Sequence, residues 1–151
     1  MNKREIRSWK KVLVTDLNYI AYELKEQINK PALVILDGPL GAGKTTFAKV
    51  FVTDGDTLSP TYSILSESHD VLHADLYRVK SRDEIIYLEL ELYLEGKIYF
   101  LVEWGKDHFS SLIKEIPEDF SYYLLSIVID ENSTNDENAT RTFTLYEVEE
   151  E

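Results

Sequence analysis

The sequence predicts an α/β fold, and three features of the chain indicate it. Short continuous apolar runs, typical of strands buried on both faces, alternate with segments whose apolar residues recur at helical spacing. Two later apolar runs flank a polar loop, which is typical of an antiparallel pair of strands. The chain has 151 residues, a length that suits one hydrophobic core, so we expect a single domain over residues 1–151.

The first half of the chain is expected to contain a helix, a strand and a second helix. Apolar residues recur at helical spacing over residues 17–28, behind a cap at Thr15 or Asp16. A continuous apolar run, ALVIL, predicts a buried strand at 32–36. A short amphipathic helix follows it, and we expect Gly55 to end this helix.

Two more buried strands are predicted in the middle of the chain, at residues 70–75 and 97–105. Between them Ser81 and Glu84 form an S-x-x-E capping box, the sequence signature of a helix start. Apolar residues at helical spacing follow the box. We therefore expect one helix that runs to Gly96.

The last part of the chain is predicted to be a helical stretch followed by the antiparallel pair. The helical stretch ends near Pro117, and the paired runs, YYLLSIVI and RTFTLYEV, occupy residues 122–129 and 141–148. Residues 147–151, EVEEE, resemble a tail, and the charged N-terminus, MNKREIRSWKK, carries no predicted element.

Composition and charge narrow the functional classes to which the protein can belong. The formal net charge is −12, and since nucleic-acid affinity depends on neutralising phosphates, we expect no direct binding of RNA or DNA. Cysteine is absent, which suits a reducing compartment, and no run approaches the roughly 18 apolar residues that span a bilayer. These features predict a cytoplasmic protein without a membrane contact.

A glycine-rich segment between the 32–36 strand and the following helix carries the strongest functional signal. It reads GPLGAGKTT and satisfies G-x-x-x-x-G-K-[ST], the P-loop pattern. Glycines let successive backbone N–H groups point at phosphate oxygens, the lysine reaches the outer phosphates, and the next hydroxyl can bind Mg²⁺. The segment therefore predicts a site for a nucleoside triphosphate and Mg²⁺, formed by Gly41, Ala42, Gly43, Lys44, Thr45 and Thr46.

Two carboxylates end predicted strands, where ligands bind in open α/β sheets. Asp75 ends DVLHAD and Glu103 ends IYFLVE. A triphosphate site needs such groups for the metal and for the attacking water. We expect Thr45 and Asp75 to hold the metal, directly or through water, and Glu103 to position or polarise the water. A simpler hypothesis, that each carboxylate caps a turn, stays open from the sequence.

Three neighbouring residues complete the candidate site. His73 is predicted to orient Asp75, because a zinc site would need more histidine or cysteine. Trp104 follows Glu103 and is predicted to wall the pocket or to pack in the core. Thr61, in SPTYS after the P-loop helix, is a candidate for a switch hydroxyl that senses the γ-phosphate through Mg²⁺.

Four ordered motifs, LGAGKTTF, SPTYSIL, HADLYR and VEWG, make the chain resemble the TsaE (formerly YjeE) family over residues 13–117. Members are bacterial ATPases required to form threonylcarbamoyladenosine in tRNA, and they act by docking on the TsaB and TsaD proteins. The resemblance implies a three-layer α/β P-loop domain with a mixed, partly antiparallel central sheet. It also implies a slow Mg-dependent ATPase whose site residues are Lys44, Thr45, Thr61, Asp75, Glu103 and Trp104.

The chain departs from the family pattern at two places. The connection between the P-loop and SPTYS is shorter than is usual in the family. Family members often carry glycine where this chain has Glu89, so we expect the helix that follows Ser81 to run straight through a point where others break.

Two other functions remain open from the sequence. A small-molecule kinase shares the P-loop but needs a cationic lid, and only three arginines follow Lys44. A nucleotide-dependent scaffold with incidental hydrolysis is the second. A GTPase has no support, because it would carry N-K-x-D for guanine, whereas Asn29 and Lys30 precede the P-loop and are followed by proline and alanine. For the ATPase, hydrolysis by the isolated chain is expected to be slow, because the sequence shows no obvious arginine finger.

Overall fold

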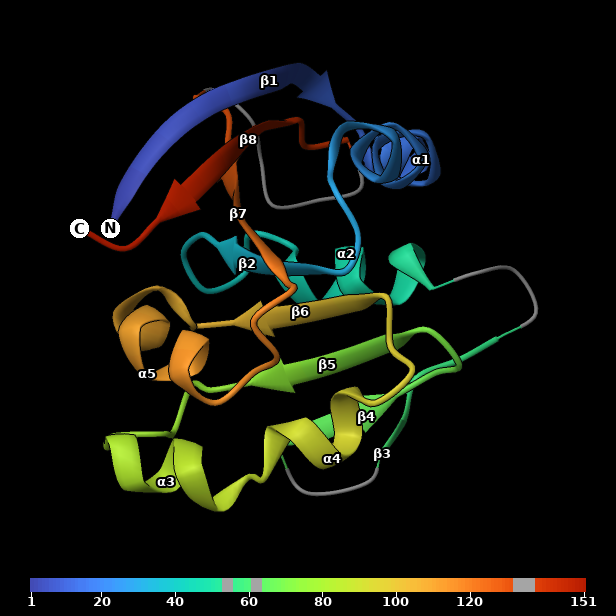
Figure 1. Cartoon of the computed structure of the whole chain (residues 1–151). Coiled ribbons are helices and arrows are strands. Elements are labelled where there is room, and N and C mark those ends of the chain that lie inside the picture. The colour runs from blue at the N-terminus through green and yellow to red at the C-terminus, as the bar shows by residue number, and fades with distance from the viewer. Residues whose placement is uncertain (53–55, 61–63, 132–137) are drawn as a thin grey trace.

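A mixed eight-stranded sheet runs through the described part of the chain (Figure 1). The computed structural model describes residues 1–52, 56–60, 64–131 and 138–151. The strand order is β1-β8-β7-β2-β6-β5-β4-β3. The strands are β1 (Asn2–Val12), β2 (Ala32–Asp37), β3 (Ser59–Pro60), β4 (Leu65–Glu67), β5 (Val71–Asp75), β6 (Tyr99–Glu103), β7 (Ser121–Ile129) and β8 (Arg141–Glu149).

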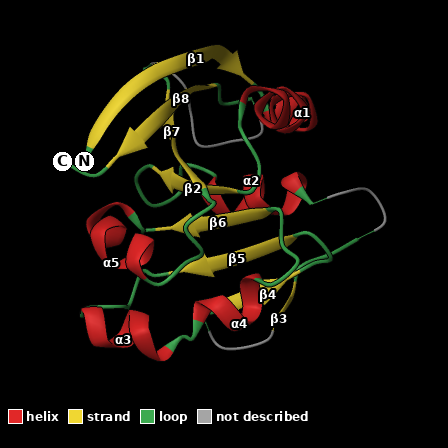
Figure 2. Cartoon of the chain, viewed as in Figure 1, coloured by secondary structure: helices red, strands yellow, loops and turns green. Residues whose placement is uncertain are grey.

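Helices cover both faces of the sheet and make it the middle of three layers (Figure 2). The α-helices are α1 (Leu17–Gln27), α2 (Lys44–Phe51), α3 (Arg82–Tyr87), α4 (Leu90–Leu94) and α5 (Phe109–Lys114). Short 3-10 helices, η1 (Val14–Asp16) and η2 (Lys106–His108), precede α1 and α5. Within the described ranges, none of these helices has the length and apolarity to cross a membrane.

The residues of β2 show how the two cores are divided. Val34 and Leu36 lie in the core under α1 and α2, whereas Leu33 and Ile35 lie in the core under α3, α4 and α5. All four are fully buried. Alternate side chains of a strand point to opposite faces, so a strand covered on both faces must be apolar throughout. The three-layer architecture with a mixed sheet is therefore confirmed.

The centre of the sheet is parallel and its two sides are antiparallel. Strands β7, β2, β6 and β5 run parallel, β8 and β1 pair antiparallel beyond β7, and β4 and β3 do so beyond β5. Asp75 and Glu103 are register partners on β5 and β6, and Leu36 on β2 is the partner of Glu103 on the other side. Strands β2, β5 and β6 thus end together at their C-terminal ends, where the P-loop also begins.

The predicted pair β7–β8 is confirmed, whereas the tail expected at the C-terminus was wrong and the strand at the N-terminus was not predicted. The charged N-terminus forms β1, and EVEEE is no separate tail, because β8 continues through Glu149, which pairs with Asn2. Strand β1 lies at the edge of the sheet and exposes most of its side chains. An edge strand needs no apolar run, so it lacks the pattern by which buried strands are found.

The predicted helix after Ser81 begins as expected and then breaks. Ser81 and Glu84 form the capping box of α3, but Glu89 has φ 53° and ψ 51° and separates α3 from α4. A straight helix would turn Leu92 toward the core, whereas in the structure Leu92 is 69% exposed and Leu90 is buried. The expectation of a continuous helix was wrong because the left-handed residue lets α4 bury a different face.

The start of α1 lies where it was predicted, although its cap differs, and the predicted end of α2 is not tested. Helix α1 begins directly after Asp16, whose carboxylate accepts a hydrogen bond from the backbone N–H of Leu13 at 2.9 Å instead of capping α1. Helix α2 ends at Phe51, and the predicted end at Gly55 lies outside the described residues.

Candidate nucleotide-binding site

The loop between β2 and α2 has the conformation that its glycines allow. Gly41 has φ 84° and Gly43, the N-cap of α2, has φ 107°, both in the left-handed region that side chains disfavour. Gly38 leaves no room for a side chain, because a Cβ there would meet the backbone carbonyl of Ile127 on β7. The loop therefore turns tightly at the end of β2 and delivers the N-terminus of α2 to the edge of the sheet.

A cavity of about 370 Å³, here called the P-loop cavity, lies over this turn. It brings together the predicted P-loop residues, both predicted carboxylates and Trp104. Predicted Thr61 lies outside the described residues, so its role stays a prediction. The lining residues are Leu40, Gly41, Ala42, Gly43, Lys44, Thr45, Thr46, Asp75, Tyr77, Glu103, Trp104 and Arg141.

Thr45 and Glu103 are in direct contact at the base of the P-loop cavity. The Thr45 hydroxyl lies 2.8 Å from Oε1 and 2.9 Å from Oε2 of Glu103, and a hydroxyl facing a carboxylate donates the hydrogen bond. Asp75 is exposed, and its Oδ1 accepts a hydrogen bond from the backbone N–H of Tyr77 at 3.1 Å. Glu103, and not Asp75, is therefore the carboxylate that touches the predicted metal-binding hydroxyl.

His73 contacts a different carboxylate from the one predicted. Its Nε2 lies 2.6 Å from Oε2 of Glu103, so the expectation that His73 orients Asp75 was wrong. On parallel neighbouring strands His73 is in register with Leu101, two residues before Glu103 on the same face of β6. The diagonal neighbour across the strands is thus within reach of the imidazole, whereas Asp75 continues outward along β5.

Glu103 is only 3% exposed, and its surroundings favour the ionised form. Burial raises its pKa, but hydrogen bonds from His73 and Thr45, together with the charge of Lys44, bring the pKa below its ordinary value. Burial lowers the pKa of the Lys44 ammonium, and the nearby carboxylates of Glu103, Asp37 and Asp75 oppose that shift. The site therefore holds a buried anion and a buried cation side by side.

The Lys44 ammonium is held by backbone and by an aromatic ring. It donates to the carbonyl of Gly38 and to that of Pro39, the latter at 3.3 Å, and lies 3.7 Å from the centre of the Trp104 ring. Trp104 has φ 60°, and its ring packs on Tyr77 with centroids 5.0 Å apart. Of the two alternatives left open by the sequence, Trp104 combines both: it lines the cavity and packs partly against the core, and it positions the lysine by a cation–π contact.

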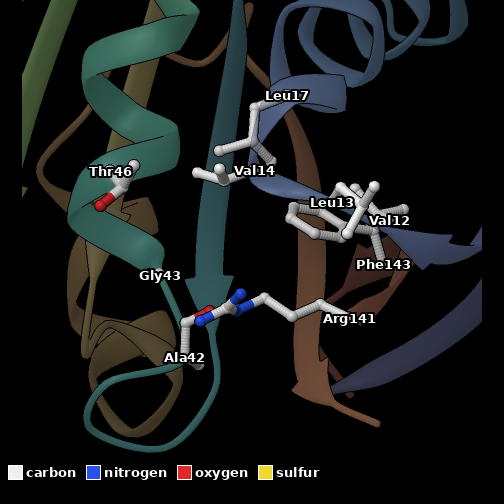
Figure 3. Close-up of a pocket in the computed structure, with 9 residues that line it drawn as sticks. All are labelled: Val12, Leu13, Val14, Leu17, Ala42, Gly43, Thr46, Arg141 and Phe143. Atoms are coloured by element: carbon white, nitrogen blue, oxygen red, sulfur yellow. The ribbon is translucent and has the colours of Figure 1, made fainter. Parts of the chain in front are cut away.

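The sequence interpretation missed Arg141 as a site residue. Its Nε donates to the carbonyl of Ala42 at 2.6 Å, across 99 positions of the chain (Figure 3). Arg141 begins β8, and nothing in its local sequence shows that this strand end lies beside the P-loop. Only the order of the strands reveals it.

A second, mostly apolar depression of about 50 Å³, here called the apolar hollow, adjoins the P-loop on the side of Arg141 (Figure 3). Four residues, Ala42, Gly43, Thr46 and Arg141, line both the apolar hollow and the P-loop cavity. The other walls come from the end of β1, the start of α1 and β8. They are Val12, Leu13, Val14, Leu17 and Phe143.

Comparison with known families agrees with this geometry. The family model described as "Threonylcarbamoyl adenosine biosynthesis protein TsaE" matches residues 14–142. The chain belongs to the TsaE family. The family acts in the biosynthesis of threonylcarbamoyladenosine in tRNA, and the resemblance seen in the four sequence motifs is confirmed.

Individual TsaE relatives match the central part of the chain. The tRNA threonylcarbamoyladenosine biosynthesis protein TsaE of Bacillus subtilis is 40% identical over 106 residues, which cover 64% of this chain and 65% of the relative. The protein of the same name from Rickettsia felis is 33% identical over 96 residues, covering 58% and 56%. These matches thus span between about half and two thirds of the relatives' length.

A solved structure supports the fold. The crystal structure of YdiB from Bacillus subtilis superposes with a TM-score of 0.56 at 24% sequence identity. The superposition covers 99% of this chain and 89% of that one. The likeness therefore extends beyond the residues that the family model matches, to the edge strand β1.

Proposed function

We propose that this TsaE-family chain binds Mg-ATP at the P-loop and hydrolyses it slowly, in support of threonylcarbamoyladenosine formation in tRNA. The observation that carries the proposal is the contact between Thr45 and Glu103, with the hydroxyl 2.8 and 2.9 Å from the two carboxylate oxygens. A P-loop hydroxyl paired with an ionised strand-end carboxylate is the arrangement that Mg-nucleotide sites need. A glycine-rich turn alone would not require it.

The chemistry of the side chains fits phosphate and magnesium. Thr45, Glu103 and Asp75 supply oxygen donors, the ligand type that Mg²⁺ prefers, and would hold it together with phosphate oxygens. Across the described ranges, no group of three or more histidines and carboxylates is placed to hold a metal by itself. Bound Mg²⁺ supplies charge neutralisation on the phosphates. Lys44 and the N-terminal amides of α2 would bind the phosphates themselves.

We place the nucleotide base in the apolar hollow. The hollow and the P-loop cavity share four lining residues, which supports one ligand that extends through both. Its remaining walls are aliphatic and aromatic side chains, the lining expected for a flat purine ring.

Slow turnover is expected from the hydrogen bond of the arginine at the site. Arg141 lines both the apolar hollow and the P-loop cavity, and it donates its Nε hydrogen to the backbone of Ala42, which engages it in supporting the loop. Glu103 or Asp75 is left to position the attacking water. Without a cationic finger over the transferred group, hydrolysis is expected to remain slow.

We also propose the TsaB and TsaD proteins as partners and the cytoplasm as the location. The family's role in the pathway supports these proposals. The net charge of −12 also supports partner proteins, because a chain this acidic needs another protein to bind the tRNA.

The first test is nucleotide binding measured by titration calorimetry. Lys44→Ala should abolish ATP affinity, whereas Lys49→Ala, on the exposed side of the same helix, should keep it. Normal ATP binding by Lys44→Ala would show that the site is misplaced.

The second test is turnover and tRNA modification. Glu103→Gln should retain nucleotide binding through Lys44 and the loop backbone, need more Mg²⁺ for the metal-dependent part of that binding, and lose hydrolysis, in the isolated chain and in a modification reaction reconstituted with TsaB and TsaD. Modification that proceeds equally well without this chain would contradict the proposed function. Full modification with Glu103→Gln would favour a scaffold whose hydrolysis is incidental.

A further inference from the structure

His73 is a buried titratable residue that the proposed function does not use. It is 8% exposed and lies behind Glu103, because Glu103 lines the P-loop cavity and His73 does not. The contact between Nε2 and Oε2 of Glu103, at 2.6 Å, is among the shortest side-chain hydrogen bonds of the site. A buried imidazole in this position calls for an explanation other than binding the ligand directly.

The imidazole is held at both of its nitrogens. A carboxylate only accepts hydrogen bonds, so Nε2 carries a hydrogen and donates it to Glu103. Nδ1 lies 3.3 Å from the hydroxyl of Ser66 on β4, which is the register partner of His73 across the antiparallel pair. The ring is therefore fixed between β4 and β6, and its direction is set by the sheet.

This arrangement fixes the direction of the Glu103 carboxylate. Oε2 is bound by His73 from behind and by Thr45 from the side of the cavity, while the hydrogen bond of Oε1 within the described ranges is to Thr45. Donors outside the immediate shell of a metal commonly fix the orientation of its carboxylate ligands and affect affinity by about 10–100-fold. The phosphates, in contrast, would be bound by Lys44 and the loop backbone, whereas the side-chain hydrogen bonds of His73 in the described part of the chain go to Ser66 and Glu103.

We propose that His73 is a positioning residue, which holds the Glu103 carboxylate in the orientation that the Mg²⁺-dependent part of nucleotide binding requires. The inference rests on the proposed function. It separates two properties of the site: affinity for the nucleotide without metal is independent of His73, and the response to Mg²⁺ depends on it.

If His73 only fills space behind Glu103, its variants should behave differently from those of a hydrogen-bond donor. The variants His73→Ala and His73→Gln distinguish the two, because the glutamine amide can donate to Glu103 and alanine cannot. His69→Gln is the matched control, since His69 is an exposed histidine four residues earlier in the chain. Thermal unfolding of each variant checks the fold, and His73→Gln carries the test if His73→Ala does not fold.

The experiment is titration calorimetry of the full chain with ADP, first in a chelator and then over a series of Mg²⁺ concentrations. In the chelator all variants should bind ADP within about twofold of the wild type. For His73→Ala, the Mg²⁺ concentration that gives half of the gain in affinity should rise by about 10–100-fold. His73→Gln should recover most of the difference, and His69→Gln should match the wild type.

Two outcomes would overturn the inference. One is a wild-type response to Mg²⁺ in a folded His73→Ala variant. The other is a His73→Gln variant whose response to Mg²⁺ is as impaired as that of His73→Ala. If His73→Ala does not fold, a His73→Gln response far from that of the wild type has the same meaning. Failure of the wild type itself to bind ADP would instead overturn the proposed function.

Discussion

Replacing Glu89 by glycine should stabilise the protein. Glu89 is exposed and has φ 53° and ψ 51°, the left-handed conformation that separates α3 from α4. This conformation costs a residue with a side chain about 1–2 kcal/mol, whereas glycine adopts it freely. Glycine also gains about 0.4–1 kcal/mol of conformational freedom in the unfolded chain, which opposes the gain. The net expectation for Glu89→Gly is an increase of about 0.5–1 kcal/mol in the free energy of unfolding.

Thermal and urea unfolding measure this difference. For a chain of this size 1 kcal/mol moves Tm by about 2–4 °C, so Glu89→Gly should raise Tm by about 1–4 °C. Glu89→Ala is the control, because alanine removes the same side chain and keeps the strained backbone. A Tm for Glu89→Gly at or below that of the wild type, or an equal rise in Glu89→Ala, would refute the argument from backbone strain.

Three further predictions concern the P-loop and acid stability. Arg141→Ala loses the 2.6 Å hydrogen bond to Ala42, worth about 1 kcal/mol, so ATP affinity by calorimetry should fall by about fivefold; unchanged affinity would contradict this. Hydrogen bonds from two threonine hydroxyls lower the pKa of Asp130 in the folded protein. The ionised carboxylate therefore stabilises the fold above about pH 4, and this stabilisation is lost as the pH falls through the lowered pKa of the folded state. The Tm of Asp130→Asn should therefore fall less between pH 6 and pH 3 than the Tm of the wild type, and equal falls in Tm would contradict this role of Asp130. Gly38→Ala places a Cβ against the carbonyl of Ile127 and should cost about 1–3 kcal/mol in urea unfolding, a result that an unchanged midpoint would exclude.

The centre of the fold and the core of the site could be predicted from the sequence. Strands β2 and β6 are buried on both faces and read as continuous apolar runs, and β5 is a mostly apolar run interrupted by His73, so the sequence displays all three directly. The P-loop lies between the first of these strands and its helix, and Asp75 and Glu103 stand at the ends of the other two. Parallel strands that end at one edge necessarily bring these groups together.

The features that could not be predicted are of two kinds. Some are contacts set by the order of the strands, and others are exposed segments whose sequence has no apolar pattern. The contact between His73 and Glu103 requires β5 beside β6, and the contact between Arg141 and the P-loop requires β8 beyond β7. Strand β1 exposes most of its side chains and carries no apolar run, and the turn at Glu89 uses a residue that gives no local signal for a left-handed conformation.

The hydrogen bond between Arg141 and the carbonyl of Ala42 matters for the order in which the pocket is completed during synthesis. The two residues are 99 positions apart, so a ribosome completes the glycine-rich turn long before it supplies the arginine that supports it. Strand β8 also brings Phe143, another wall of the apolar hollow, at the same late stage. A nascent chain released early therefore lacks part of the pocket, so a ligand that binds there stabilises the finished polypeptide more than a truncated fragment.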